Sequence, residues 1–82
     1  MALNLEVISP EGILFKGQCH MAVVPASTGE IGVMENHEVF VANLGEGNVR
    51  VFDEQQNQLH SFAVKSGFAK MQDLNNLLVL VS

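Results

Sequence analysis

The sequence predicts an all-β protein, folded as a two-sheet β-sandwich or flattened barrel of about eight to ten short, mainly antiparallel strands. Three observations support this. Apolar and polar residues alternate with period two in several segments, turn residues recur about every eight to twelve positions, and β-branched residues crowd the apolar segments. The 82 residues fit one domain, so we expect a single domain over residues 1–82.

The first two predicted strands form a hairpin. Apolar residues alternate with polar ones over residues 3–7 and again over residues 13–23. Between them, residues 9–12 read Ser-Pro-Glu-Gly, a turn in which proline presets φ and glycine is free to adopt a positive φ. The apolar residues expected to share one face of the second segment are Ile13, Phe15, Cys19, Met21 and Val23.

Further strands follow at short intervals. Residues 25–29 form a second turn, and residues 30–34 a short strand in which Gly32 marks a bulge or a close backbone approach. Residues 39–44 are nearly continuously apolar, as in a strand that is covered on both faces. The remaining strands are expected over residues 49–52, 59–64, 68–71 and 77–81, with polar turns between them.

Composition argues against several classes of partner. Nine acidic and four basic residues give a net charge of −5, which repels nucleic-acid phosphates and anionic lipid surfaces. A single cysteine excludes an internal disulfide and favours a reducing compartment. The first residues lack the pattern of a signal peptide, and no apolar run approaches the length of a membrane span. We therefore expect no nucleic acid and no direct lipid insertion, and any membrane association must go through a protein partner.

The sequence offers little for catalysis or metal binding. Cys19 and His20 are adjacent, so a strand sends them to opposite faces, and His37 and His60 lie far away. There is no Gly-x-Ser-x-Gly elbow and no phosphate-binding glycine loop. We expect no metal, no cofactor and no enzymatic activity. A small hydrolase that uses His37 or Cys19 is the weaker alternative.

One stretch is more specific than the rest. Residues 28–37 read Thr-Gly-Glu-Ile-Gly-Val-Met-Glu-Asn-His, which resembles the signature of the ATP synthase ε-subunit family: Gly-Glu-aliphatic-Gly-aliphatic, followed closely by a histidine. Other segments fit the family in the same order, namely residues 3–12, 14–17, 42–51, 66–71 and 76–81. The resemblance covers essentially the whole chain, as the N-terminal β-sandwich domain of that family.

The resemblance implies a non-catalytic rotor subunit of the central stalk of an F-type ATP synthase. Such a subunit links the γ shaft to the c-subunit ring and couples ion translocation to ATP synthesis or hydrolysis. It would lie peripherally on the cytoplasmic side of the bacterial inner membrane. The alternative is a free-standing all-β interaction module unrelated to rotary machinery.

The resemblance also implies contact residues. Glu30 matches the acidic position that faces the c-ring loops, where it could accept hydrogen bonds from an arginine on the ring. His37 matches the histidine near the γ subunit; its alternative is a surface or half-buried histidine satisfied by nearby backbone. The expected c-ring contacts are Gly29, Glu30 and Ile31, the expected γ contacts are His37, Val39, Phe40 and Val41, and the loop-shaping residues are Gly29 and Gly32. Met21 and Met34 are expected to fill the core or its edge.

Two departures from the family pattern are visible. Glu35 and Val39 stand where many relatives carry proline, which changes the expected geometry of the loop around His37. The family usually continues into a pair of C-terminal helices that restrains ATP hydrolysis and in some members binds ATP. The printed sequence ends at Ser82, and we expect neither inhibition nor nucleotide binding from these residues.

Overall fold

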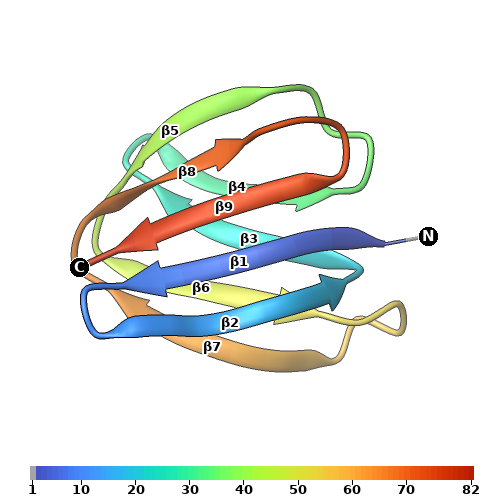
Figure 1. The fold of residues 1–82 in the computed structure, drawn as a ribbon, viewed down its shortest axis with the longest axis horizontal. Coiled ribbons are helices and arrows are strands. Elements are labelled where there is room, and N and C mark those ends of the chain that lie inside the picture. Colours follow the sequence, from blue (N-terminus) through green and yellow to red (C-terminus); the bar gives the residue numbers. More distant parts are fainter. Residues whose placement is uncertain (1) are drawn as a thin grey trace.

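The computed structural model describes residues 2–82, and all of its regular secondary structure is β-strand (Figure 1). No helix occurs in this range, hence none that could cross a membrane. The nine strands are β1 (Leu3–Ser9), β2 (Gly12–Cys19), β3 (Met21–Ala26), β4 (Gly29–Met34), β5 (Phe40–Leu44), β6 (Gly47–Phe52), β7 (Gln58–Val64), β8 (Gly67–Met71) and β9 (Asn76–Val81).

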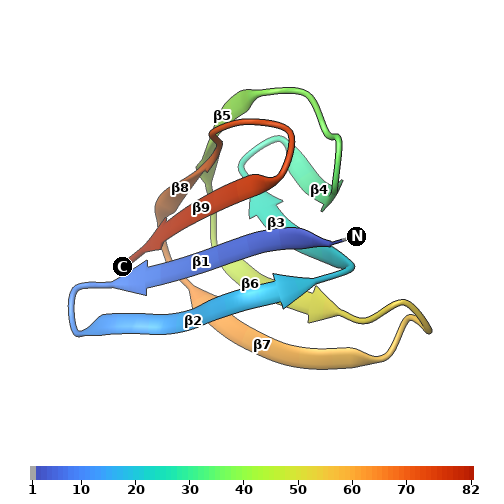
Figure 2. The same cartoon turned by 45° about the vertical axis from the view of Figure 1, so that its right-hand side comes forward.

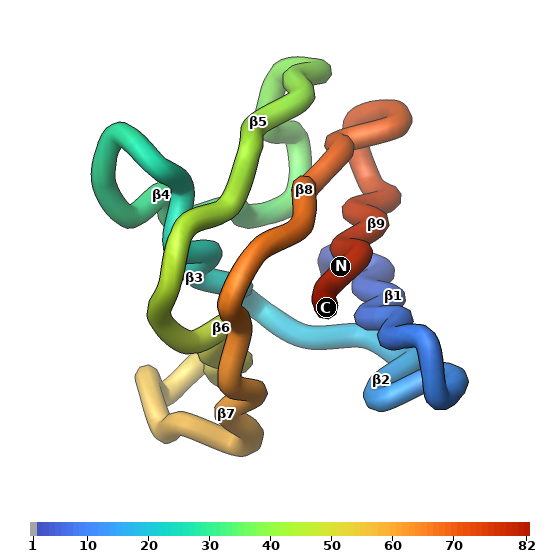
Figure 3. The backbone as a smooth tube through the Cα atoms, turned by 90° about the vertical axis from the view of Figure 1, so that its left-hand side faces the viewer, coloured from blue at the N-terminus to red at the C-terminus, as the bar shows by residue number. Residues whose placement is uncertain are grey.

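The strands form one curled sheet that folds over into two layers. Their order is β2-β1-β9-β8-β5-β3-β6-β7, and β4 pairs with β3. Figure 3 looks along the strands and shows β1, β2 and β9 on one side of the molecule and β3 and β4 on the other. The two layers are joined where β3 meets β5, by the ladder pair Ala26–Leu44 and by the neighbouring backbone hydrogen bonds from Ser27 to Asn43 and from Gly45 to Pro25. Only the β1–β9 pairing is parallel, so the expected mainly antiparallel sandwich is confirmed.

The core lies between the two layers and is built by alternate residues of each strand. In β1 and β9 every second side chain is almost completely buried, as the period-two pattern predicted. Each buried leucine or valine stabilises the fold by roughly 1.5–3 kcal/mol relative to an exposed one. The core residues common to both layers include Leu3, Leu5, Val7, Val24, Val33, Val49, Val51, Ala69, Met71, Leu77 and Val79.

The inward face of β3 differs from the sequence-based expectation. Ala22 and Val24 are fully buried, whereas Met21 and Val23 are partly exposed. His20 lies between β2 and β3 and is not part of either strand. The chain leaves one layer and enters the other at this residue, so the inward positions change from odd to even numbers. An alternation carried through residue 20 therefore assigned the wrong face.

The start of β2 shows the same effect. Ile13 was expected to point inward, but it is 59% exposed. The β1–β2 ladder pairs Val7 with Phe15 and Ile8 with Ile13, so Leu14 is an extra residue on one strand. This irregularity reverses the faces of the residues before it. The expected hairpin and its positive-φ glycine are otherwise present, because Gly12 has φ 135°.

Three further expectations about single elements were wrong. Residues 39–44 are not covered on both faces: β5 begins at Phe40, and Val41 is 66% exposed. Gly32 marks neither a bulge nor a close backbone approach: the β3–β4 register continues without a shift, and the atom nearest to an added Cβ is the side-chain sulfur of Met21. Met34, at the end of β4, is exposed rather than packed in the core.

Aromatic side chains close the side of the sandwich where the layers are not hydrogen-bonded. The edge strands β2 and β7 belong to different layers and face each other across this side of the sandwich (Figures 2 and 3). The Phe15 ring of β2 lies 5.1 Å from the His60 ring and 6.4 Å from the Phe62 ring of β7, centroid to centroid. These contacts join the two layers at the side opposite the Ala26–Leu44 pair.

Candidate docking site on strands β4 and β5

The β3–β4 turn presents Glu30 to solvent. Ser27 and Thr28 form the turn, and Gly29 follows with φ 135°, a backbone conformation that favours glycine. The side chain of Glu30 is 57% exposed. Along β4 the side chains alternate, so Glu30 points outward while Ile31 packs against the core. Of the three expected c-ring contacts, Ile31 is therefore the one turned inward.

Glu30 has a partner within the chain. The Arg50 guanidinium of β6 donates a hydrogen bond from Nη2 to Glu30 Oε1, at 2.8 Å, and forms an ion pair with it. Arg50 also lies over the Phe52 ring, 5.7 Å from its centroid. Sequence reasoning missed Arg50, which stands twenty positions away in the chain. Opposite charges on outward positions of two strands predict an ion pair only when the order of the strands in the sheet is known.

The β4–β5 loop holds His37 at the other end of β4. Asn36 has φ 70°, and its N–H donates to the carbonyl of Leu74 in the β8–β9 turn, at 2.6 Å. His37 Nδ1 lies 2.8 Å from the Glu38 carbonyl, which can only accept, so Nδ1 carries the proton. The imidazole packs edge-on against Phe40 with 5.0 Å between ring centroids. The loop backbone thus satisfies one nitrogen of the imidazole ring.

An exposed apolar pair follows His37. Val39 is 60% exposed and Val41 66% exposed, while Phe40 between them is half-buried against the core. The four expected γ contacts therefore split into two kinds. Val39 and Val41 face solvent, and Phe40 supports the His37 ring. Apolar side chains this exposed on an edge of the molecule are suited to a protein partner.

The two groups of residues lie at opposite ends of β4. Figure 1 shows the β3–β4 turn at one end of the strand and the β4–β5 loop at the other. Met34 stands four positions after Glu30, which corresponds to about 13 Å along an extended strand. This distance is smaller than the width of an ordinary protein–protein interface, so the two ends could contact one partner or two. The sequence-based prediction assigns them to two different partners.

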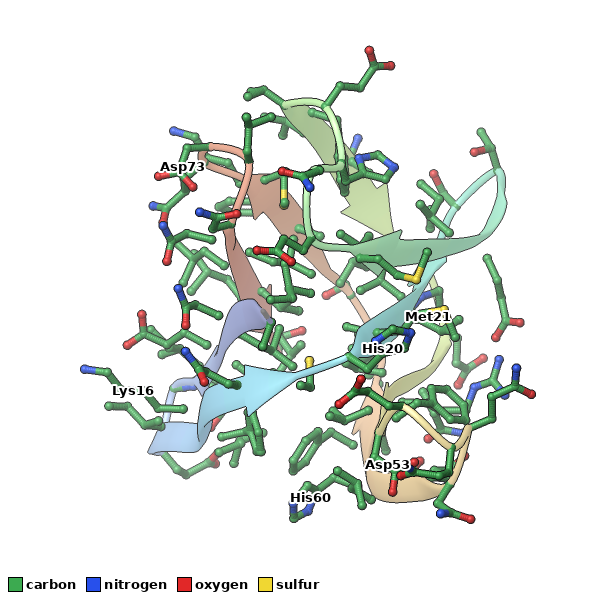
Figure 4. All side chains as sticks on the ribbon, turned by 90° about the vertical axis from the view of Figure 1, so that its right-hand side faces the viewer. Lys16, His20, Met21, Asp53, His60 and Asp73 are labelled. Atoms are coloured by element: carbon green, nitrogen blue, oxygen red, sulfur yellow. The ribbon has the colours of Figure 1, made fainter. Side chains whose placement is uncertain are left out.

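The remaining titratable groups do not form a catalytic or metal-binding arrangement within residues 2–82. Figure 4 shows His20, His60 and Asp73 on separate parts of the molecule, and no group of three or more ligating residues was found over this range. Burial raises the pKa of the Cys19 thiol to about 11, so the thiol stays protonated at neutral pH. The Ser66 hydroxyl bonds to that of Ser82 rather than to a base. These contacts argue against the hydrolase alternative.

Comparisons with known proteins match almost the whole chain. A family model described as ATP synthase, Delta/Epsilon chain, beta-sandwich domain covers residues 2–82. The ATP synthase epsilon chain of Leptospira borgpetersenii is 41% identical over 71 residues, which are 87% of this chain and 54% of that protein. ATP synthase epsilon chain 1 of Methylococcus capsulatus is 38% identical over 72 residues, 88% of this chain and 51% of that protein.

Solved structures share the fold. A chain of the Euglena gracilis mitochondrial ATP synthase, in a structure of OSCP, F1 and the c-ring, superposes with a TM-score of 0.86 at 20% identity. The alignment covers 98% of this chain and 50% of that one. The present chain spans about half the length of the curated relatives that it matches. It belongs to the ATP synthase delta/epsilon-chain β-sandwich family.

Proposed function

We propose that this chain is a non-catalytic rotor subunit of the central stalk of an F-type ATP synthase. It links the γ shaft to the c-subunit ring and couples ion translocation to ATP synthesis or hydrolysis. Family membership over residues 2–82 supports this role, as do relatives named ATP synthase epsilon chain. Its place would be peripheral, on the cytoplasmic side of the bacterial inner membrane, with no cofactor of its own.

The observation that carries the proposal is the pair of exposed sites at the two ends of β4. We assign the c-ring contact to the turn end, with Glu30 as its outward acid and Gly29 shaping the backbone. We assign the γ contact to the loop end, through His37, Val39 and Val41, with Phe40 supporting the histidine. A subunit that joins two partners needs two such sites.

The fold is suited to transmitting torque. Both layers pack on one shared core, and protein interiors packed in this way have low compressibility. The hydrogen-bonded connection between the layers at β3 and β5 is supplemented by the aromatic contacts between β2 and β7. A force applied at one end of β4 is therefore carried through a stiff body rather than a flexible loop.

The test uses the assembled ATP synthase in inverted membrane vesicles. Glu30→Arg reverses the charge at the turn and places two cations beside each other, so ATP-driven ion pumping should fall relative to ATP hydrolysis. The variant chain should remain folded, because Glu30 is exposed. Pumping and hydrolysis that both stay at wild-type levels would contradict the assignment of Glu30 to the ring.

A second candidate is a free-standing interaction module that uses the same exposed β5 surface. The exposed side chains of Val39, which precedes β5, and Val41 in β5 are compatible with either role. Affinity capture of the tagged chain from native membranes separates the two. The rotor role predicts that γ and the proteolipid ring come down together. Capture of an unrelated partner without either subunit would favour the alternative.

A further inference from the structure

We infer that Arg50 is a positioning residue for the docking acid Glu30, an inference that rests on the proposed function of the β3–β4 turn. The two residues sit on different strands, β4 and β6, which flank β3 on opposite edges. The Arg50 side chain reaches across β3 to Glu30, with 2.8 Å between Nη2 and Oε1. Arg50 thus ties the edge strand to the interior of its layer.

The backbone explains why Glu30 needs such a tie. Pro25 is the residue opposite Glu30 in the β3–β4 ladder. The carbonyl of Pro25 accepts from the N–H of Gly45, which lies on the β5 side, so the polar backbone groups of Pro25 face away from β4. The Pro25–Glu30 pair is therefore of the non-hydrogen-bonded kind. By the same alternation, the N–H and C=O of Glu30 are directed to the free edge of β4.

Arg50 is itself held in place, so it can act as a strut. Its guanidinium lies over the Phe52 ring on the same strand, and 34% of the side chain is exposed. Position 50 pairs with Val23 in the centre of the layer and with Ser61 on the other side. A guanidinium fixed at this point holds one carboxylate oxygen of Glu30 and leaves Oε2 free for a partner.

Two consequences distinguish a positioning role from a merely structural one. Removing the guanidinium should weaken docking although Glu30 itself is retained. Exchanging the two charges should restore the ion pair but not the docking, because the carboxylate then stands on β6 instead of at the turn. A lysine at position 50 keeps the charge and should preserve most of the docking.

The experiment measures the Kd of the 82-residue chain for a detergent-solubilised γ–c-ring assembly that lacks this subunit. We expect Arg50→Gln and Glu30→Gln each to raise Kd by about two- to five-fold, the range of an exposed ion pair. Arg50→Lys should stay near wild type, and the exchanged pair Glu30→Arg with Arg50→Glu should bind as weakly as Glu30→Gln. The matched control is Lys65→Gln, which removes an equal charge from an exposed position between β7 and β8.

Amide hydrogen exchange of Ile31 supplies a readout that does not depend on the partner. Its neighbour Glu30 is the tethered residue, and Ile31 is paired with Val24 of β3. Ile31 should exchange about two- to five-fold faster in Arg50→Gln and recover in the exchanged pair. Wild-type exchange and wild-type Kd in Arg50→Gln, with a raised Kd in Glu30→Gln, would overturn the positioning role alone. Wild-type Kd in both single variants would overturn the proposed ring contact, and the positioning role with it.

Discussion

The interior strand β9 and the edge strand β4 have the same length and opposite uses. β9 is hydrogen-bonded on both sides, to β1 and β8, and three of its six side chains are buried. β4 pairs only with β3, and four of its six residues are exposed. The comparison shows that one region of this small sandwich supplies stability while another supplies surface. Substitutions in the region that supplies stability should therefore lower the free energy of unfolding, whereas substitutions in the exposed region should weaken binding to a partner.

The largest effect is expected at Gly67, where β8 meets β9. Gly67 has φ 146°, and an added Cβ would collide with the carbonyl oxygen of Leu80. Gly67→Ala should lower the free energy of unfolding by about 3–5 kcal/mol, because backbone strain and a backbone clash act together. Urea unfolding followed by circular dichroism measures it.

Gly12 provides the matched control for that prediction. It also has a positive φ, of 135°, but no atom lies within 4 Å of the position of an added Cβ. Gly12→Ala should cost only the strain, about 1–2 kcal/mol. Equal losses for the two variants would mean that the close approach of β9 contributes nothing.

A smaller effect, and in a different assay, is expected at Val41. Because this side chain is exposed, Val41→Ser should change the free energy of unfolding by less than about 0.5 kcal/mol. Binding to the γ subunit should weaken by roughly three- to ten-fold if the valine is buried there. Leu59→Ser, at an exposed position on β7, is the control and should leave binding unchanged. A Val41→Ser variant with a strongly reduced free energy of unfolding and an unchanged affinity for γ would contradict this prediction.

The smallest effect concerns the polar turns outside both regions. Asp73 accepts hydrogen bonds from the N–H groups of Asn75 and Asn76 and from the Asn76 side chain, which lowers the pKa of its carboxyl. Asp53 accepts hydrogen bonds from the N–H groups of Asn57 and Gln55, which lowers the pKa of its carboxyl in the same way.

A lowered folded-state pKa means that the stabilisation is present above the unfolded pKa and is lost as pH falls through the folded pKa, here below about pH 4. The urea concentration at the midpoint of unfolding, measured from pH 6 down to pH 2, should decrease in that acidic window. The fall should be shallower in Asp73→Asn, and an identical profile in that variant would contradict the hydrogen-bond account.

Much of the fold could be predicted from local pattern. The alternation in residues 3–7 identified the inward residues of β1, and the turn at residues 9–12 identified its hairpin. The prediction failed where a single residue interrupts the period, at His20 and at Leu14, because one inserted residue reverses every face beyond it. Alternation tells which residues of one strand share a face. It does not tell whether the same alternation continues into the next strand.

The candidate site was harder to predict for a related reason. The turn glycine and the exposed acid are local features, and Gly29 has the positive φ that its place in a turn suggested. The exposure of Val41 depends instead on whether another strand covers β5, and the Arg50–Glu30 pair depends on two strands meeting across β3. Both facts belong to the topology of the sheet, which the local pattern does not contain.

In the proposed rotor role, the two ends of β4 touch two different proteins. Photo-crosslinking from position 30 and from position 39 of this chain, in the assembled ATP synthase, tests it most directly. The probe at position 30 should label the c subunit, and the probe at position 39 should label γ. Labelling of one and the same subunit from both positions would contradict it.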